Sequence, residues 1–250
     1  MLLKLLKMTH QLLFGLLIST LIACSNSNNI NAANAGDIHL QLGIRYLSMN
    51  KLELARDNLL EALKKNSDNA QAHNALAFLY EKLNQPDNAK KHYESALDLT
   101  PDDLGAQNNF GRFLCEHGEY KKGMDLLTTA SSNPINDRRW MALTNAGRCQ
   151  LGLGQKKLAE NYFRQALQLD TAYAPALSEM QKIAYQNGDF WGAKGFLQRY
   201  LGVAAHTAET LWFAAQAEQA LGNKELAKEY KKLLLEKFPL SDEAKKVTVD

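Results

Sequence analysis

Three cysteines, Cys24, Cys115 and Cys149, are the residues of this chain best suited to covalent chemistry. A thiolate can be acylated, can pair with a second cysteine or can bind a metal. The chain has no C-x-x-C pair, no H-E-x-x-H motif, no glycine-rich phosphate loop and no G-x-S-x-G motif. The histidines beyond residue 24 stand apart from one another: His39, His73, His92, His117 and His206. The residue types therefore predict no catalytic residues, no metal site and no cofactor, and they leave acylation and disulfide formation as the chemistry to explain.

A ladder of small residues at near-constant spacing indicates which elements position the cysteines. Its rungs are Ala55, Ala89, Gly123, Ala159, Ala193 and Ala227, at steps of 34, 34, 36, 34 and 34 residues. A period of 34 with small residues in register is typical of the tetratricopeptide repeat, a pair of helices A and B. Each pair has an apolar face that it can bury only by stacking on the next pair. The pattern predicts an all-α superhelical solenoid of six tetratricopeptide repeats, whose surface suits a protein partner rather than a small-molecule substrate.

The ladder also sets the bounds of the repeats. They are 36–69, 70–103, 104–139, 140–173, 174–207 and 208–241. Residues suited to a left-handed turn stand between helices A and B of the six units: Asn50, Asn84, Gly118, Gly154, Gly188 and Gly222. Residues 242–250 are interpreted as a C-terminal tail.

The start of the chain has a different composition. Two lysines precede a mostly apolar run from Gln11 to Ile22, which is typical of a secretory signal and short for a membrane span of about 20 residues. The string Leu-Ile-Ala-Cys that ends at Cys24 resembles the lipobox of bacterial lipoproteins. That resemblance implies a signal peptide over 1–23 and acylation of Cys24, and residues 24–35 are interpreted as the lipidated cysteine and a flexible tether. The alternative is a plain signal peptide that happens to end at a cysteine.

The expected cellular compartment indicates whether the other two cysteines can form a disulfide. Ser25, rather than an aspartate, follows Cys24, which resembles the default sorting of bacterial lipoproteins to the outer membrane. We therefore expect a lipid-anchored protein whose repeats face the oxidising periplasm. Cys115 and Cys149 then form an even pair on neighbouring helices A, and we predict a disulfide between them that contributes roughly 3–4 kcal/mol in the chain-entropy model. The alternative is two buried thiols that act as small hydrophobic side chains.

The charge balance excludes one class of partner. The chain carries 29 basic and 27 acidic residues, and removal of the signal takes away Lys4 and Lys7 but no acid, which leaves 27 of each sign. Nucleic-acid binding needs a basic stripe that neutralises phosphates. No nucleic-acid partner is therefore expected.

The groove positions of helix A carry the candidate binding residues. Leu40, Ile44 and Leu47 follow the spacing i, i+4, i+7 and form an apolar stripe in the first repeat. Phe78 adds an aromatic ring in the second repeat, and later repeats place polar residues there. We expect the stripe to hold a short partner segment, either an amphipathic helix or an extended strand. The alternative is that the tether or the curvature of the helix hides the stripe.

Two cysteine blocks carry a family resemblance. Residues 108–115 read N-N-F-G-R-F-L-C and residues 145–149 read N-A-G-R-C. They resemble two signatures of the type IV pilus biogenesis lipoproteins of the PilF/PilW family. The resemblance implies a pilotin, which binds the secretin subunit of the type IV pilus and promotes its outer-membrane targeting and its multimerisation. It also implies six repeats and a disulfide that joins the two blocks.

Two other functions fit a lipid-anchored array of repeats. One is a scaffold in the machinery that assembles outer-membrane β-barrels, and the other is a scaffold that recruits cell-wall enzymes. An enzyme is not expected, because the sequence shows no converging set of titratable groups.

Overall fold

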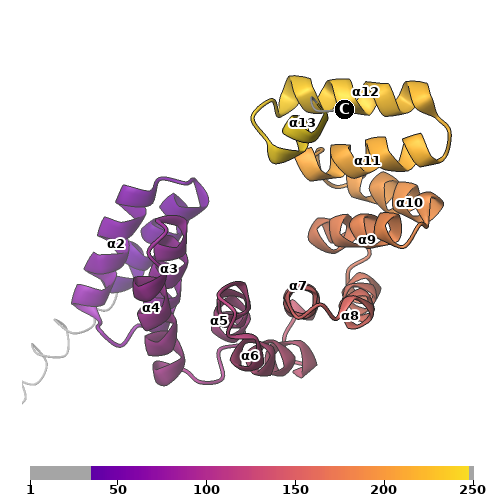
Figure 1. The fold of residues 1–250 in the computed structure, drawn as a ribbon. Helices are drawn as coiled ribbons and strands as arrows, with labels where there is room; N and C mark the ends of the chain where they lie inside the picture. Colours follow the sequence, from indigo (N-terminus) through magenta and orange to yellow (C-terminus); the bar gives the residue numbers. More distant parts are fainter. Residues whose placement is uncertain (1–34, 248–250) are drawn as a thin grey trace, which may run out of the picture. The chain divides into compact units, whose positions relative to one another are not determined.

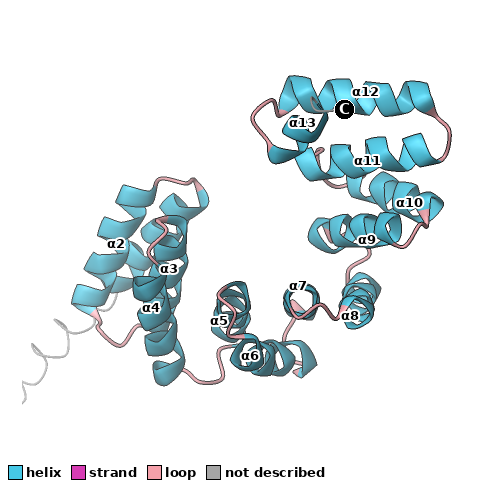
Figure 2. Ribbon diagram, viewed as in Figure 1, coloured by secondary structure: helices cyan, strands magenta, loops and turns pink. Residues whose placement is uncertain are grey.

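The structure is a computed structural model that describes residues 35–247. In this range the chain forms helices joined by turns and contains no strand (Figure 2). The first helix spans residues 35–48. The others are α2 (Leu52–Lys65), α3 (Ala70–Lys82), α4 (Pro86–Leu99), α5 (Leu104–Glu116), α6 (Tyr120–Ser132), α7 (Arg139–Gly152), α8 (Lys156–Leu169), α9 (Ala174–Gln186), α10 (Phe190–Leu201), α11 (Ala208–Ala220), α12 (Lys224–Lys237) and α13 (Asp242–Val247). The predicted all-α class is confirmed for this part of the chain.

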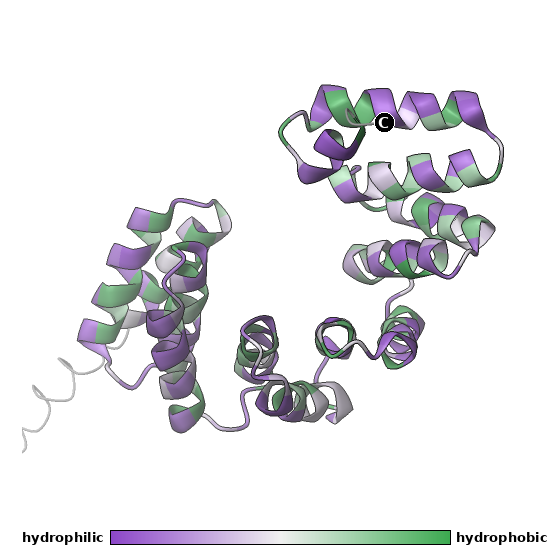
Figure 3. Cartoon of the chain, viewed as in Figure 1, coloured by the Kyte–Doolittle hydropathy of each residue, from purple (hydrophilic) through white to green (hydrophobic). Residues whose placement is uncertain are grey.

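Each predicted repeat contains one pair of helices (Figure 1). Helix A of a repeat packs on its own helix B, as α3 does on α4, α7 on α8, α9 on α10 and α11 on α12. The rungs of the small-residue ladder are all buried: Ala55, Ala89, Gly123, Ala159, Ala193 and Ala227. Apolar and polar residues are interspersed along the helices (Figure 3). Tight helix pairs with one apolar face are what the 34-residue period predicts.

The turns between helices A and B follow the predicted chemistry. Asn50 and Asn84 both have a φ of 56°. Gly118, Gly154, Gly188 and Gly222 have φ values of 81°, 72°, 77° and 84°. Glycine and asparagine adopt this left-handed conformation at lower cost than other residues. The prediction of a left-handed residue in the turn of all six repeats is confirmed.

The chain divides into two compact units between Ala106 and Gln107. Unit 1 holds the first two repeats. Its core consists of apolar side chains from the first helix, α2 and α3, including Leu59 and Leu76. Unit 2 holds most of the other four repeats, and Phe163 and Met180 lie in its largest cluster of buried side chains. The sequence predicted one continuous array, and the division falls close to the predicted boundary at 103.

The C-terminal segment is more ordered than a tail. Residues 242–247 form α13, which packs on α11 and α12 and buries Ala244 beside Leu211 and Leu234. The ammonium group of Lys246 lies 5.5 Å from the centre of the Trp212 ring. A short helix thus covers the apolar side of the last repeat.

The start of the chain lies outside the described residues. This applies to the predicted signal peptide, to Cys24 and to the predicted tether up to residue 34. Within residues 35–247, no helix combines the length and the apolarity that crossing a bilayer requires.

Candidate functional site

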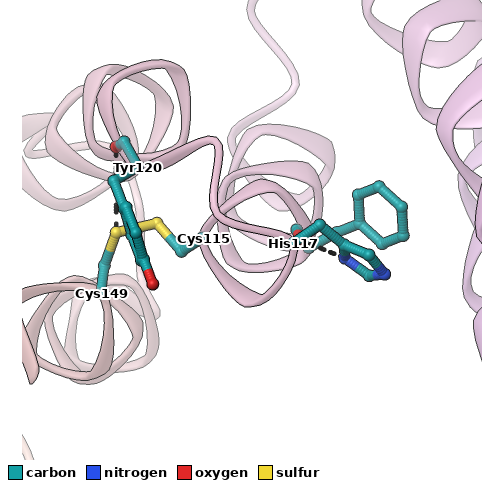
Figure 4. Close-up of a disulfide and its surroundings, with 5 residues drawn as sticks. Cys115, His117, Tyr120 and Cys149 are labelled. Carbon is teal, nitrogen blue, oxygen red and sulfur yellow. Dashed lines mark hydrogen bonds between the residues drawn. A yellow bond between two sulfur atoms is a disulfide. The ribbon is translucent and has the colours of Figure 1, made fainter. Parts of the chain in front are cut away.

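A disulfide joins helix A of the third repeat to helix A of the fourth (Figure 4). The Sγ atoms of Cys115 on α5 and Cys149 on α7 lie 1.96 Å apart, and their Cα atoms lie 5.3 Å apart. Disulfides need Cα atoms within about 4.4–6.8 Å, so the backbones of the two helices lie where a bridge can form. Both cysteines are buried, and the Sγ atom of Cys149 lies 3.9 Å from the carbonyl oxygen of Tyr120. The structure therefore brings together the two cysteines that the sequence pairs.

Glycines let the helices around this bridge approach closely. A β-carbon on Gly111 of α5 would lie 2.8 Å from a side-chain carbon of Leu127 and 2.9 Å from the carbonyl oxygen of Gly123 on α6. A β-carbon on Gly147 of α7 would lie 2.6 Å from the ring of Phe163 on α8. Contacts this short do not occur for real β-carbons, so both helix pairs depend on glycine at these positions.

A buried amide pair also joins α5 and α7. The side-chain Nδ2 of Asn145 donates a hydrogen bond of 2.9 Å to Oδ1 of Asn108, and both residues are 8% exposed. Removing one amide would leave the other polar group unsatisfied, which typically costs about 1–3 kcal/mol. The two cysteine blocks are therefore held by a covalent bond and a hydrogen bond.

A pocket of about 230 Å³ opens beside the disulfide. It is lined by Arg112, Cys115, Glu116, Tyr120, Asn145, Arg148, Cys149 and Gly152. Within it, Nη1 of Arg112 lies 2.7 Å from Oε2 of Glu116. Nε of Arg148 lies 2.8 Å from Oε1 of Glu179 on α9. Two arginines and one carboxylate, that of Glu116, thus line the pocket beside the disulfide.

The same position of helix A carries a cation in three successive repeats, because Lys182 follows Arg112 and Arg148 at steps of one repeat. Nζ of Lys182 lies 2.6 Å from Oε1 of Glu209 and 5.9 Å from the centre of the Phe213 ring. One side chain of each of these ion pairs is partly buried and the other is more exposed, and solvent-accessible ion pairs contribute only about 0–1 kcal/mol each to stability. Because breaking such an ion pair costs little free energy, these side chains can form ion pairs with a bound segment instead.

The predicted apolar stripe of the first helix is wrong at two of its three residues. Leu40 and Leu47 are only 3% and 8% exposed, and they pack with Leu76 and Leu79 of α3 in the core of unit 1. The reason is that this side of helix A faces the next helix A, so the apolar residues close the contact between repeats. Leu40 and Leu47 are therefore core residues rather than binding residues.

Ile44 and Phe78 remain exposed in unit 1. They are 41% and 38% exposed and occupy equivalent positions of two successive helices A. Nζ of Lys82, one turn after Phe78, lies 5.4 Å from the centre of its ring. We call the exposed pair, Ile44 and Phe78, the N-terminal patch. It is smaller than the predicted stripe and has a cation at its edge.

The sequence did not reveal a histidine pair within the second repeat. Nδ1 of His73 on α3 lies 2.9 Å from Nδ1 of His92 on α4, and Nε2 of His73 lies 3.2 Å from the carbonyl oxygen of Ser67. Because a carbonyl only accepts, His73 donates from Nε2, and its Nδ1 accepts the proton that His92 donates. Burial, and then the neighbouring His73, lower the pKa of His92 to about 4. His92 also stacks on Tyr80 with ring centres 5.4 Å apart, so the pair is part of the packing.

Among residues 35–247, no group of three or more His, Cys, Asp or Glu side chains is placed to hold a metal ion. Two surfaces stand out in the described part of the chain: the N-terminal patch in unit 1, and the surface beside the disulfide in unit 2.

Comparison with known proteins identifies the repeats first. Residues 43–84 match a family model described as TPR repeat, and residues 70–103 and 142–173 match models described as Tetratricopeptide repeat. The predicted repeat type is therefore confirmed.

Relatives extend the match over most of the chain. The type IV pilus assembly protein PilF of Pseudomonas aeruginosa is 26% identical over 205 residues, which is 82% of this chain and 81% of PilF. The solved structure of PilF superposes with a TM-score of 0.76 at 25% identity and covers 88% of this chain and 99% of that one. The crystal structure of PilW, described as a widely conserved type IV pilus biogenesis factor, gives a TM-score of 0.75 at 28% identity over 85% of this chain and 98% of PilW.

This chain belongs to the family of tetratricopeptide-repeat proteins that includes PilF and PilW. An uncharacterised protein of Haemophilus influenzae is a further relative, 30% identical over 128 residues, which is 51% of this chain and 71% of that protein. The expected resemblance to the PilF/PilW family is thus confirmed. The match extends almost from end to end of PilF and PilW.

Proposed function

We propose that this chain acts in type IV pilus biogenesis as an outer-membrane lipoprotein of the pilotin kind. In this role it binds the secretin subunit, carries it to the outer membrane and promotes its assembly into the multimeric ring. The observation that carries the proposal is the sequence match to PilF, 26% identical over 82% of this chain, together with the 28% identity to PilW, because other tetratricopeptide-repeat structures cover similar lengths at only 16–19% identity.

The anchor is the second component of the proposal. The lipobox ends at Cys24, and ten residues lie between it and the first described residue, Ala35. Stable membrane attachment takes more than one acyl chain, and a bacterial lipoprotein cysteine carries several. Acylation of Cys24 would supply the membrane address that a soluble secretin subunit lacks.

The N-terminal patch is the proposed contact for the secretin. Exposed apolar side chains at equivalent positions of adjacent helices suit an apolar segment of a partner that crosses both helices. The edge of the patch at Lys82 favours a partner segment with an acidic residue beside its apolar side chains. The ion-paired surface of unit 2 would then contact more polar parts of the same partner.

A deletion experiment tests the function. Loss of the gene is expected to abolish surface pili and the detergent-resistant secretin multimer, while monomeric secretin still accumulates. Porins in the same membranes serve as the control, because barrel-assembly scaffolds act on them as well. Unchanged secretin multimers would contradict the proposal, and loss of porins would point to β-barrel assembly instead.

A further inference from the structure

One face of helix A is buried in the later repeats. In α3 it comprises Ala72, Leu76 and Leu79, each 0% exposed, which pack against apolar residues of α2, the preceding helix B. In α9 the equivalent residues are Ala176, Met180 and Ile183, which are buried against α8. The residues of α7 and α11 at these positions are buried too: Ala142, Ala146, Cys149, Thr210, Ala214 and Ala217. Each of these repeats therefore packs on the preceding repeat through this face of helix A.

The first repeat exposes the same face. Its residues are Ile38, Leu42, Arg45 and Met49, spaced by 4, 3 and 4 along one side of the first helix and its end. Ile38, Leu42 and Met49 are 61%, 37% and 52% exposed, and Arg45 is exposed as well. We call these four residues the end face. Terminal repeats of such arrays normally present a polar outer side to water. The last repeat of this chain is covered by α13, but the end face of the first repeat is apolar. We therefore expect another surface to cover the end face.

We propose that the end face rests on the lipid bilayer to which Cys24 anchors the chain. This inference builds on the proposed acylation of Cys24. Only ten residues separate Cys24 from Ala35, and ten residues span at most about 35 Å when fully extended. The end face is thus confined to the neighbourhood of the membrane, on the helix that directly follows the tether.

The composition of the end face fits a lipid surface. Amphipathic helices bind the interface through an apolar face, with basic residues outside that face that reach the headgroups, and Arg45 stands beside the apolar residues Leu42 and Met49. A basic residue near an anionic leaflet contributes about 1 kcal/mol. A second copy on the same face would bring two Arg45 side chains into one apolar contact, which is unfavourable. The segment from Ser25 to Asn34 offers one large apolar side chain, Ile30, and is too polar to cover the face itself.

Fluorophores at single cysteines test the contact. The mature, acylated full-length protein is placed in vesicles of phosphatidylethanolamine and phosphatidylglycerol with Ile38→Cys or Met49→Cys carrying an environment-sensitive dye. The native cysteines do not compete, because Cys24 is acylated and the other two are paired. Ile44→Cys is the matched control, since Ile44 is 41% exposed on the opposite side of the same helix.

Nitroxide-labelled lipid should quench the dyes at 38 and 49 at least about twofold more than the dye at 44, because an interfacial helix sinks about 5–10 Å into the headgroup region. Equal quenching at the three positions in protein that floats with the vesicles would overturn this inference alone. A blue-shifted but unquenched dye at 38 would also overturn it and would indicate a protein occupant. Protein that fails to float would overturn the acylation of Cys24 and this inference together, without bearing on secretin binding by the N-terminal patch.

Discussion

A β-carbon placed on Gly123 would lie 2.5 Å from the Sγ atom of Cys115, in the space that the disulfide sulfur occupies. Gly123 is the one rung of the small-residue ladder that is not alanine. The third repeat thus gives up the alanine methyl group that its five counterparts bury, and the sulfur of Cys115 takes its place.

We therefore expect Gly123→Ala to destabilise the protein by about 1–3 kcal/mol, the usual cost of overpacking a core. The free energy of unfolding from urea denaturation measures the effect. Gly195→Ala is the control, because Gly195 lies in α10 with nothing within 4 Å of the added carbon. That change should stabilise the helix by up to about 1 kcal/mol. Destabilisation by both substitutions to the same extent would contradict the steric account.

The disulfide itself gives a second prediction. Denatured, acylated protein purified from the periplasmic side should show no free thiols, and it should show two after reduction. Replacing both cysteines, Cys115→Ala with Cys149→Ala, should lower the free energy of unfolding by about 3–4 kcal/mol, because the bridge closes a loop with a sequence separation of 34. Two free thiols in the unreduced sample would show that the bridge does not form in the cell.

The histidine pair predicts a pH dependence of stability. The folded pKa of His92, about 4, lies below its ordinary value of 6.5, so the unfolded chain binds the proton more tightly. The stabilising contribution is fully present above pH 6.5 and is lost as the pH falls toward 4. Its upper limit is about 3 kcal/mol, and partial exposure of the ring reduces it to about 1–2 kcal/mol.

The matched variant for this test comes from the first repeat, where His39 pairs with Asn58 at the positions that His73 and His92 occupy in the second. His92→Asn should keep the contact and flatten the dependence of unfolding free energy on pH between 6.5 and 4. An unchanged pH profile in the variant would show that other groups cause the loss of stability.

The two sides of the first helix can be separated by substitution. Leu40→Ala should lower the free energy of unfolding by about 2–5 kcal/mol, because it removes a buried side chain from the core of unit 1. Ile44→Ala should change it by less than about 0.5 kcal/mol, since Ile44 is exposed. Thermal and urea unfolding of the two variants, side by side, decides the point. A large loss for Ile44→Ala would mean that it too is a core residue.

The periodic features of this chain were predictable from its sequence. The small-residue ladder and the left-handed turns follow from the period of about 34 residues. The pairing of Cys115 with Cys149 was predictable because they form an even pair of cysteines on neighbouring helices A, although they are not equivalent residues, since the step between these two repeats is 36. The histidine pair was missed because His73 and His92 lie on different helices, 19 residues apart. The 34-residue period does not indicate which residues of helices A and B within one repeat are in contact. A comparison with His39 and Asn58 of the first repeat could have revealed it, since both pairs share one register.

The orientation of the first helix was not predictable from its pattern. Leu40, Leu42, Ile44 and Leu47 cover more than one side of the helix, so spacing alone cannot separate the side that packs on α3 from the exposed sides. The later repeats did not help either, because the counterparts of Leu40, Asn108 and Thr144, are polar in type and yet buried. The short helix α13 was missed because it lies outside the repeat period.

Binding of the secretin by protein with an altered N-terminal patch tests the central claim most directly. The double variant Ile44→Ser with Phe78→Ser is compared with Leu54→Ser with Leu60→Ser, which changes two residues of α2 that are 46% and 43% exposed. Affinity for purified secretin subunit, measured by calorimetry, should fall at least about tenfold in the first variant and stay unchanged in the second, because apolar contact residues contribute more than about 1 kcal/mol when central. Equal affinities in both variants, with both folded, would contradict the account.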